Sequence, residues 1–172
     1  MSLLVAVFAT LALQQPDPLA PASLGRVLCY EPDVARQTCY GTASYRWLSD
    51  GTIISDIVVA ASQVPAVFVH SSAPVFVRGD AECTRLAPSA GQITAIYDDG
   101  ERLSGSDFES FRRILGSIID NKTGPGRDLC FTYEPLADGD LKSTARIDGV
   151  VRPDLEGTVR WVRPAEGWRV AF

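Results

Sequence analysis

The sequence is poor in histidine and lysine, and its net charge is negative. It has one histidine, only 2 lysines among its 16 basic residues, and a formal net charge of -5 at pH 7. Because phosphate neutralisation needs clustered cations and no such cluster occurs, nucleic acid is not an expected partner. No apolar run reaches the roughly 18 residues that cross a bilayer as a helix, so no transmembrane helix is expected in the mature chain.

The motifs of common catalytic and nucleotide-binding sites are also missing. No G-x-S-x-G, G-x-G-x-x-G or Walker A sequence occurs. We interpret His70 as a solvated residue at a hairpin end rather than as a general base. Neighbouring carboxylates are interpreted as turn or helix-start residues: Asp98/Asp99, Asp107/Glu109 and Asp138/Asp140. The sequence therefore predicts no catalytic residue, no metal ligand and no cofactor, and it favours a protein without enzymatic activity.

Residues 1–22 have the layout of a secretory signal peptide. Residues 3–13 form a largely apolar block, and small residues follow as far as Ala22. Export signals have this order of apolar region and cleavage site, although here no basic residue precedes Arg26. A second possible cleavage site follows Ala12. We therefore expect residues 1–22 to be removed, residues 23–172 to form one disulfide-stapled domain, and the protein to act in the periplasm or outside the cell.

The cysteines support the same compartment. Their number, 4, is even, and no C-x-x-C pair is present, so disulfides fit better than a zinc ribbon or a thioredoxin-like motif. Four cysteines allow three connectivities, and spacing alone does not choose among them. We favour one bridge between Cys29 and Cys39 and another between Cys83 and Cys130, since the second would tie the segment before the expected helix to the strand after it.

Alternating apolar and polar residues predict a chain made largely of antiparallel hairpins. Residues 38–48 and 52–61 flank a D-G turn, and the register of this hairpin stays open. Residues 67–70 and 75–78 are similar β-branched runs on either side of a polar, proline-containing link. They predict a second hairpin.

A further hairpin is expected at the C-terminus. A loop at residues 164–167 would pair Arg163 with Trp168. Trp161 then lies opposite Val170, and the large apolar side chains of both strands share one face. This agreement between loop length and side-chain parity favours the pairing.

One principal helix is expected near residues 107–119. Ser106 followed by Glu109 has the spacing of a capping box, with Ser106 as N-cap. Apolar residues at helical spacing predict a stripe that packs on a sheet: Phe108, Phe111, Ile114, Leu115, Ile118 and Ile119. The sequence therefore predicts an α+β fold in which a strand-rich antiparallel sheet is covered by this helix.

Several aromatic residues could line a ligand pocket, with Arg46 or Arg160 at its rim: Tyr45, Trp47, Tyr97, Trp161 and Trp168. Core packing explains the same residues, and we favour that interpretation.

Three hypotheses for function follow. The first is a secreted or periplasmic non-catalytic domain that binds a protein or a cell-envelope component. The alternative is a small pocket-containing enzyme or ligand carrier that uses His70 or a carboxylate. The third is an eight-stranded outer-membrane barrel, which the alternating C-terminal residues fit, whereas the expected helix and the cysteines fit it badly. A deep cleft with His70 or convergent carboxylates would favour the second hypothesis.

Overall fold

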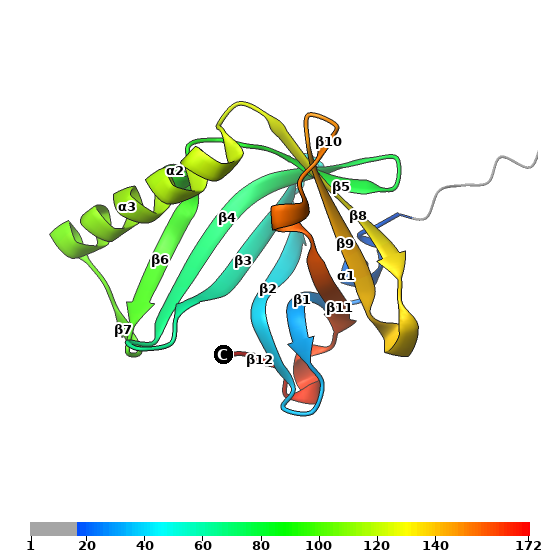
Figure 1. The fold of residues 1–172 in the computed structure, drawn as a ribbon, viewed down its shortest axis with the longest axis horizontal. Coiled ribbons are helices and arrows are strands. Elements are labelled where there is room, and N and C mark those ends of the chain that lie inside the picture. The colour runs from blue at the N-terminus through cyan, green and yellow to red at the C-terminus, as the bar shows by residue number, and fades with distance from the viewer. Residues whose placement is uncertain (1–16) are drawn as a thin grey trace, which may run out of the picture.

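The computed structural model describes residues 17–172 of the chain. The fold is rich in antiparallel strands and has one long helix, which confirms the expected α+β class (Figure 1). Two disulfides are present, as expected, and they join Cys29 to Cys39 and Cys83 to Cys130, the pairing that the sequence favoured. The apolar block at residues 3–13 lies outside the described residues.

The elements follow one another along the described chain as short strands with few helices. The strands are β1 Val27–Asp33, β2 Thr38–Trp47, β3 Ile53–Ser62, β4 Val67–Arg78, β5 Ala81–Arg85, β6 Ile93–Asp98, β7 Glu101–Arg102, β8 Asp128–Pro135, β9 Leu141–Ile147, β10 Val150–Val151, β11 Gly157–Val162 and β12 Arg169–Val170. The helices are α1 Ala20–Ser23, α2 Ser89–Gln92 and α3 Gly105–Thr123, with 3-10 turns η1 Ala137–Gly139, η2 Pro153–Leu155 and η3 Pro164–Glu166.

Eight of these strands close into a barrel. They pair antiparallel in the order β1, β2, β3, β4, β5, β8, β9 and β11, and β11 pairs back with β1. Since successive side chains alternate between the two faces, each strand has an inner and an outer set. The inner set is mainly apolar and includes the buried residues Leu28, Ala43 and Val159. The outer set includes charged pairs such as Arg46 with Asp56.

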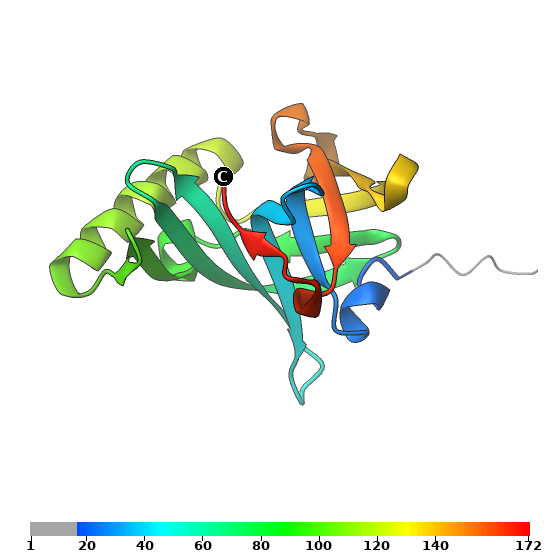
Figure 2. The same ribbon diagram turned by 90° about the horizontal axis from the view of Figure 1, so that it is seen from below.

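A short helical segment closes one end of the barrel. Leu19 precedes α1 and is only 1% exposed, because it packs with Leu28, Ala43 and neighbouring inner residues. In both views α1 and α3 lie at opposite ends of the molecule (Figures 1 and 2). Cleavage after Ala22 would remove Leu19 from this core, whereas cleavage after Ala12 would retain it.

The prediction of a second hairpin is wrong, because residues 67–78 form the single strand β4. One edge of β4 pairs with β3. The other edge pairs first with β6, over residues 67–71, and then with β5, over residues 76–78. Pro74 lies between these two pairings, and its carbonyl accepts a hydrogen bond from the Thr84 hydroxyl at 2.8 Å. The N–H that proline lacks is thus not needed on that edge, so Pro74 does not break the strand.

α3 begins earlier than expected and without the expected cap. Ser104 is the N-cap residue, and no side chain caps the helix. Ser106 lies inside the helix, while the Glu109 carboxylate accepts a hydrogen bond from Arg112 at 2.7 Å. The capping box of Ser106 and Glu109 is therefore a wrong prediction, because the carboxylate pairs with a guanidinium one turn further along.

Only part of the apolar stripe of α3 is buried. Phe108 and Leu115 pack on the inner side of β4 and β6. Docking on α2 sets this orientation, since a Cβ at Gly116 would lie 2.5 Å from the backbone nitrogen of Ala90. The remaining stripe is exposed and is called here the outer face of α3: Phe111 at 42%, Ile114 at 61% and Ile118 at 52%.

The expected C-terminal hairpin is also wrong. β12 pairs in parallel with β2 and makes no pair with β11. Trp161 faces the barrel interior, whereas Trp168 packs on the outer side against Val162 and the Cys29–Cys39 disulfide. Gly167, at φ 87°, adopts the left-handed conformation that redirects the chain between them. The two tryptophans therefore lie on opposite faces of the sheet.

Candidate ligand-binding site

A cavity of about 490 Å³ occupies the inner side of the barrel and reaches α2 and α3. This volume lies within the range of about 300–1,000 Å³ that is usual for small-molecule sites. Its wall is mainly apolar and includes Ile57, Val59, Val75, Ile93, Leu129, Phe131 and Val159. The size and the lining are therefore those of a site for a small apolar molecule.

Glu82 places a carboxylate in this apolar wall. It is an inner residue of β5, and it is only 6% exposed. Oε2 accepts hydrogen bonds from the Tyr45 hydroxyl at 2.9 Å and from the Tyr133 hydroxyl at 2.7 Å. Within the described residues no hydrogen bond reaches Oε1. Since every buried side-chain oxygen there has a hydrogen-bond partner, Oε1 is not fully buried. Oε2 is thus held in place, Oε1 keeps some exposed surface, and Glu82 as a residue lines the cavity.

The tyrosines that hold Glu82 belong to the packed part of the barrel. Tyr45 comes from β2 and Tyr133 from β8, and both contact the buried cluster around Leu28. The Tyr45 ring also lies 5.8 Å from the ring of Trp161, measured between centroids. Since packing fixes these rings, the carboxylate is held by a rigid support rather than by mobile side chains.

Burial changes the protonation of this group. It raises the pKa of Glu82 above its ordinary value, although hydrogen bonds from Tyr133 and Tyr45 act in the opposite direction. Burial, together with the charge of Glu82, also raises the pKa values of Tyr30, Tyr45 and Tyr133. A raised carboxyl pKa means that Glu82 stabilises the fold most at low pH, and that this contribution is lost as the pH rises through the folded-state pKa. Ionised Glu82 is thus a cost to stability that a ligand of opposite charge would offset.

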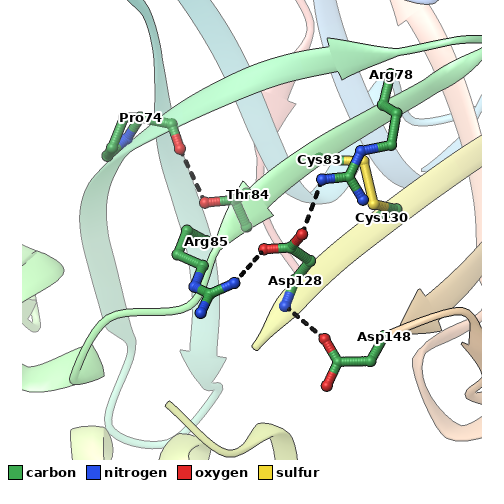
Figure 3. The surroundings of a disulfide bond; sticks show 8 residues. All are labelled: Pro74, Arg78, Cys83, Thr84, Arg85, Asp128, Cys130 and Asp148. Atoms are coloured by element: carbon green, nitrogen blue, oxygen red, sulfur yellow. Dashed lines mark hydrogen bonds and ion pairs between the residues drawn. A yellow bond between two sulfur atoms is a disulfide. The ribbon is translucent and has the colours of Figure 1, made fainter. Parts of the chain in front are cut away.

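The disulfide next to Glu82 fixes the strand that carries it. Cys83 on β5 is bonded to Cys130, directly opposite on β8, with Cα atoms 4.0 Å apart. On the same outer face the Asp128 carboxylate accepts hydrogen bonds from Arg78 and Arg85 at 2.8 and 3.0 Å (Figure 3). These bonds tie β4, β5 and β8 together on the outside, while Glu82 points to the inside.

Some residues of the lining reach solvent, and this side of the cavity is called here its mouth. It includes the exposed Glu31 and the half-buried Glu156 and Gln92. The Glu31 carboxylate accepts a hydrogen bond from the backbone N–H of Thr158 at 3.0 Å. Lys142 lies 3.7 Å from Glu156, measured between Nζ and Oε2. The carboxylates at the mouth are thus oriented by the barrel strands rather than free in solvent.

The residues that sequence reasoning weighed for chemistry lie away from this cavity. His70 is on the outer face of β4, in the middle of a strand rather than at a hairpin end, and its ring lies 5.0 Å from that of Tyr97. Burial lowers the pKa of His70, and the nearby Arg102 adds to this. The three carboxylate pairs do not line the cavity either. In the third pair, Asp140 accepts a hydrogen bond from Arg160 at 2.6 Å.

The aromatic residues weighed for a pocket follow the packing interpretation except for Trp47, which is 46% exposed. None of the five aromatics weighed for a pocket lines the cavity, whose aromatic walls are Tyr30, Tyr40 and Phe131. Glu82 was missed. One signal for it exists in the sequence: in an alternating strand, Cys83 bonded on the outer face leaves Glu82 on the inner face. That signal requires knowing which face the disulfide occupies.

Taken together, the strands and the cavity define an eight-stranded barrel with an apolar interior and a buried carboxylate. Within residues 17–172 no three His, Cys, Asp or Glu side chains gather as metal ligands would. No helix in that part of the chain is both long and apolar enough to cross a membrane. Comparison with protein-family models, with curated proteins and with solved structures finds no match to this chain.

Proposed function

We propose that this protein binds a small, mainly apolar molecule inside its barrel. The observation that carries the proposal is the cavity of about 490 Å³ between the Glu82 carboxylate and α3. The cavity is partly open to solvent and its wall is mainly apolar, so a small molecule could enter it and cover that wall. An apolar molecule placed there would gain dispersion contacts with the wall and would be removed from water.

The compartment belongs to the same proposal. We place the protein in the periplasm or outside the cell, and the two disulfides support this, because disulfides persist in oxidising compartments. A carrier of an apolar molecule is useful in such a compartment, since apolar compounds cross an aqueous space poorly without one.

The other two hypotheses have narrower support. An outer-membrane barrel turns apolar side chains outward, whereas here the outer face carries charged pairs such as Arg46 with Asp56 and Arg160 with Asp140. Binding of a protein or an envelope component is supported by the outer face of α3, where Ile114 is 61% exposed. It is the second candidate function.

Binding of a neutral, polarity-sensitive probe, N-phenyl-1-naphthylamine, tests the proposed function. We expect saturable 1:1 binding with enhanced fluorescence. Ser143 lines the cavity on β9 and is 4% exposed, so Ser143→Phe places a ring inside it. This change should weaken probe binding by about tenfold or more, since it removes volume that the probe would fill.

Thr144→Phe is the matched control, because Thr144 is the next residue on β9 and faces outward. It should leave the probe affinity unchanged. Absence of saturable binding to the folded wild-type protein would contradict the proposal. So would equal affinity of the Ser143→Phe and wild-type proteins, with circular dichroism confirming that both are folded.

A further inference from the structure

The charged side chains that line the cavity are all acidic, although one of them, Glu156, is paired with Lys142. Glu82 lines its interior and Glu31 and Glu156 line its mouth, and no lysine, arginine or histidine of the described residues lines it. A ligand with a carboxylate or phosphate would therefore meet like charge and no cation, which is unfavourable in a poorly solvated site. The lining instead complements a cation, or at least a hydrogen-bond donor.

The geometry of Glu82 adds a second, independent observation. Its side chain is 6% exposed, and Oε2 is occupied by the hydroxyls of Tyr45 and Tyr133. Both hydroxyls act as donors, so they stabilise the ionised carboxylate and leave Oε1 as an acceptor. An ammonium group is a compact donor of three hydrogen bonds, and it would supply the missing partner and the opposite charge together.

We propose that the natural ligand is an amphiphilic amine: an apolar body that fills the cavity, with a protonated amino group hydrogen-bonded to Glu82 Oε1. This assignment rests on the proposed function, since it names the class of molecule that the cavity takes. The acidic mouth favours the same class, because Glu31 and Glu156 attract cations as they approach.

A series of three ligands with one chain length tests the assignment: decylamine, decanol and decanoic acid. Each displaces N-phenyl-1-naphthylamine, and titration calorimetry gives the dissociation constants. We expect decylamine to bind at least about tenfold more tightly than decanol, because Glu82 is already desolvated in the free protein and the amine adds a charge-assisted hydrogen bond to it. Decanoic acid should bind most weakly. Decanol is the reference in every protein. The measured quantity is therefore the dissociation constant of decanol divided by that of decylamine.

Glu82→Gln removes the charge and keeps the shape of the side chain. In this variant the ratio should fall to about one or below. Glu134→Gln on the exposed end of β8 changes the net charge equally and should keep the wild-type ratio. If Glu82→Gln does not fold, the pH dependence of decylamine binding to the wild-type protein tests the amine assignment instead. Alkylamines stay protonated well below their pKa of about 10, so decylamine affinity should fall as the pH decreases through the raised pKa of Glu82, with decanol unaffected.

Two other carboxylates line the cavity, so the profile is also measured in the Glu31→Gln/Glu156→Gln protein, where the dependence on Glu82 should persist. The remaining titratable groups near Glu82 are tyrosines. They are Tyr30 from β1, Tyr45 from β2 and Tyr133 from β8, whose pKa values all lie above the ordinary value and which stay neutral in the acidic range. Equal binding of decylamine and decanol, or a decylamine affinity that does not change with pH, would overturn the amine assignment alone. Failure of the neutral probe and of all three ligands to bind would instead overturn the proposed function.

Discussion

Replacing Leu19 by alanine is expected to lower the free energy of unfolding by about 3 kcal/mol, within the usual range for a leucine truncated in a packed core. Leu19 is 1% exposed and fills the end of the barrel beside Leu28, Ala43 and Val159. The strands around it are hydrogen-bonded on both sides, so they cannot collapse into the space that the smaller side chain leaves. Urea unfolding followed by tryptophan fluorescence measures the change.

Leu24→Ala is the control for this prediction. Leu24 is the C-cap residue of α1 and is 77% exposed, so its truncation should change the unfolding free energy by less than about 0.5 kcal/mol. If the two variants are equally stable, α1 does not close the barrel. Proteolytic loss of residues 17–22 without loss of stability would lead to the same conclusion.

Removing the Cys83–Cys130 disulfide is expected to destabilise the protein by about 4 kcal/mol on the chain-entropy estimate, the largest single effect that we predict. This bridge closes a loop with a sequence separation of 47, so the unfolded chain gains much freedom without it. The double variant Cys83→Ala/Cys130→Ala avoids free thiols, and its unfolding midpoint in urea is compared with that of the wild type.

The second disulfide provides the comparison. Cys29 and Cys39 are separated by 10 positions, and the same estimate gives about 3 kcal/mol for their removal. The order of the two effects is the specific expectation. A larger loss from the Cys29→Ala/Cys39→Ala variant would mean that packing of Trp168 on that bridge, rather than loop length, governs its contribution.

Local sequence patterns were sufficient to predict those strands in which apolar and polar residues alternate strictly. The β2–β3 hairpin follows from the alternation of Ala43 and Tyr45 with polar residues, and its turn residues are the usual ones. The register was open because it depends on closure of the barrel, which places Tyr45 opposite Ser55. Register is therefore a tertiary property here, although the strands themselves are locally encoded.

The two wrong hairpin predictions, at residues 67–78 and at the C-terminus, have the same physical origin. Pro74 is a strong turn signal by itself, and only the change of neighbour from β6 to β5 makes it compatible with a continuous strand. At the C-terminus, loop length and parity favoured a hairpin, but the outer surface near Cys29 and Cys39 offered Trp168 a better site. In both cases a contact distant in sequence outweighs the local preference.

Only the general kind of binding site could be predicted from the sequence, and its residues could not. A pocket with a carboxylate was one of the alternatives, yet the residue concerned, Glu82, lies in a short strand whose inner face the pattern does not identify. Its neighbours Tyr45 and Tyr133 are 37 and 51 positions away in sequence. Only closure of the barrel brings these three side chains together, so a local motif could not have indicated the site.

The most direct test of interior binding is an isotope-filtered NOE experiment on decylamine bound to protein with labelled isoleucine and valine methyl groups. The cavity account predicts NOEs from the decyl chain to the methyl groups of Ile57, Val75 and Val159, which line the barrel interior. NOEs confined to Ile114 and Ile118, on the outer face of α3, would contradict it and would place the binding surface outside the barrel.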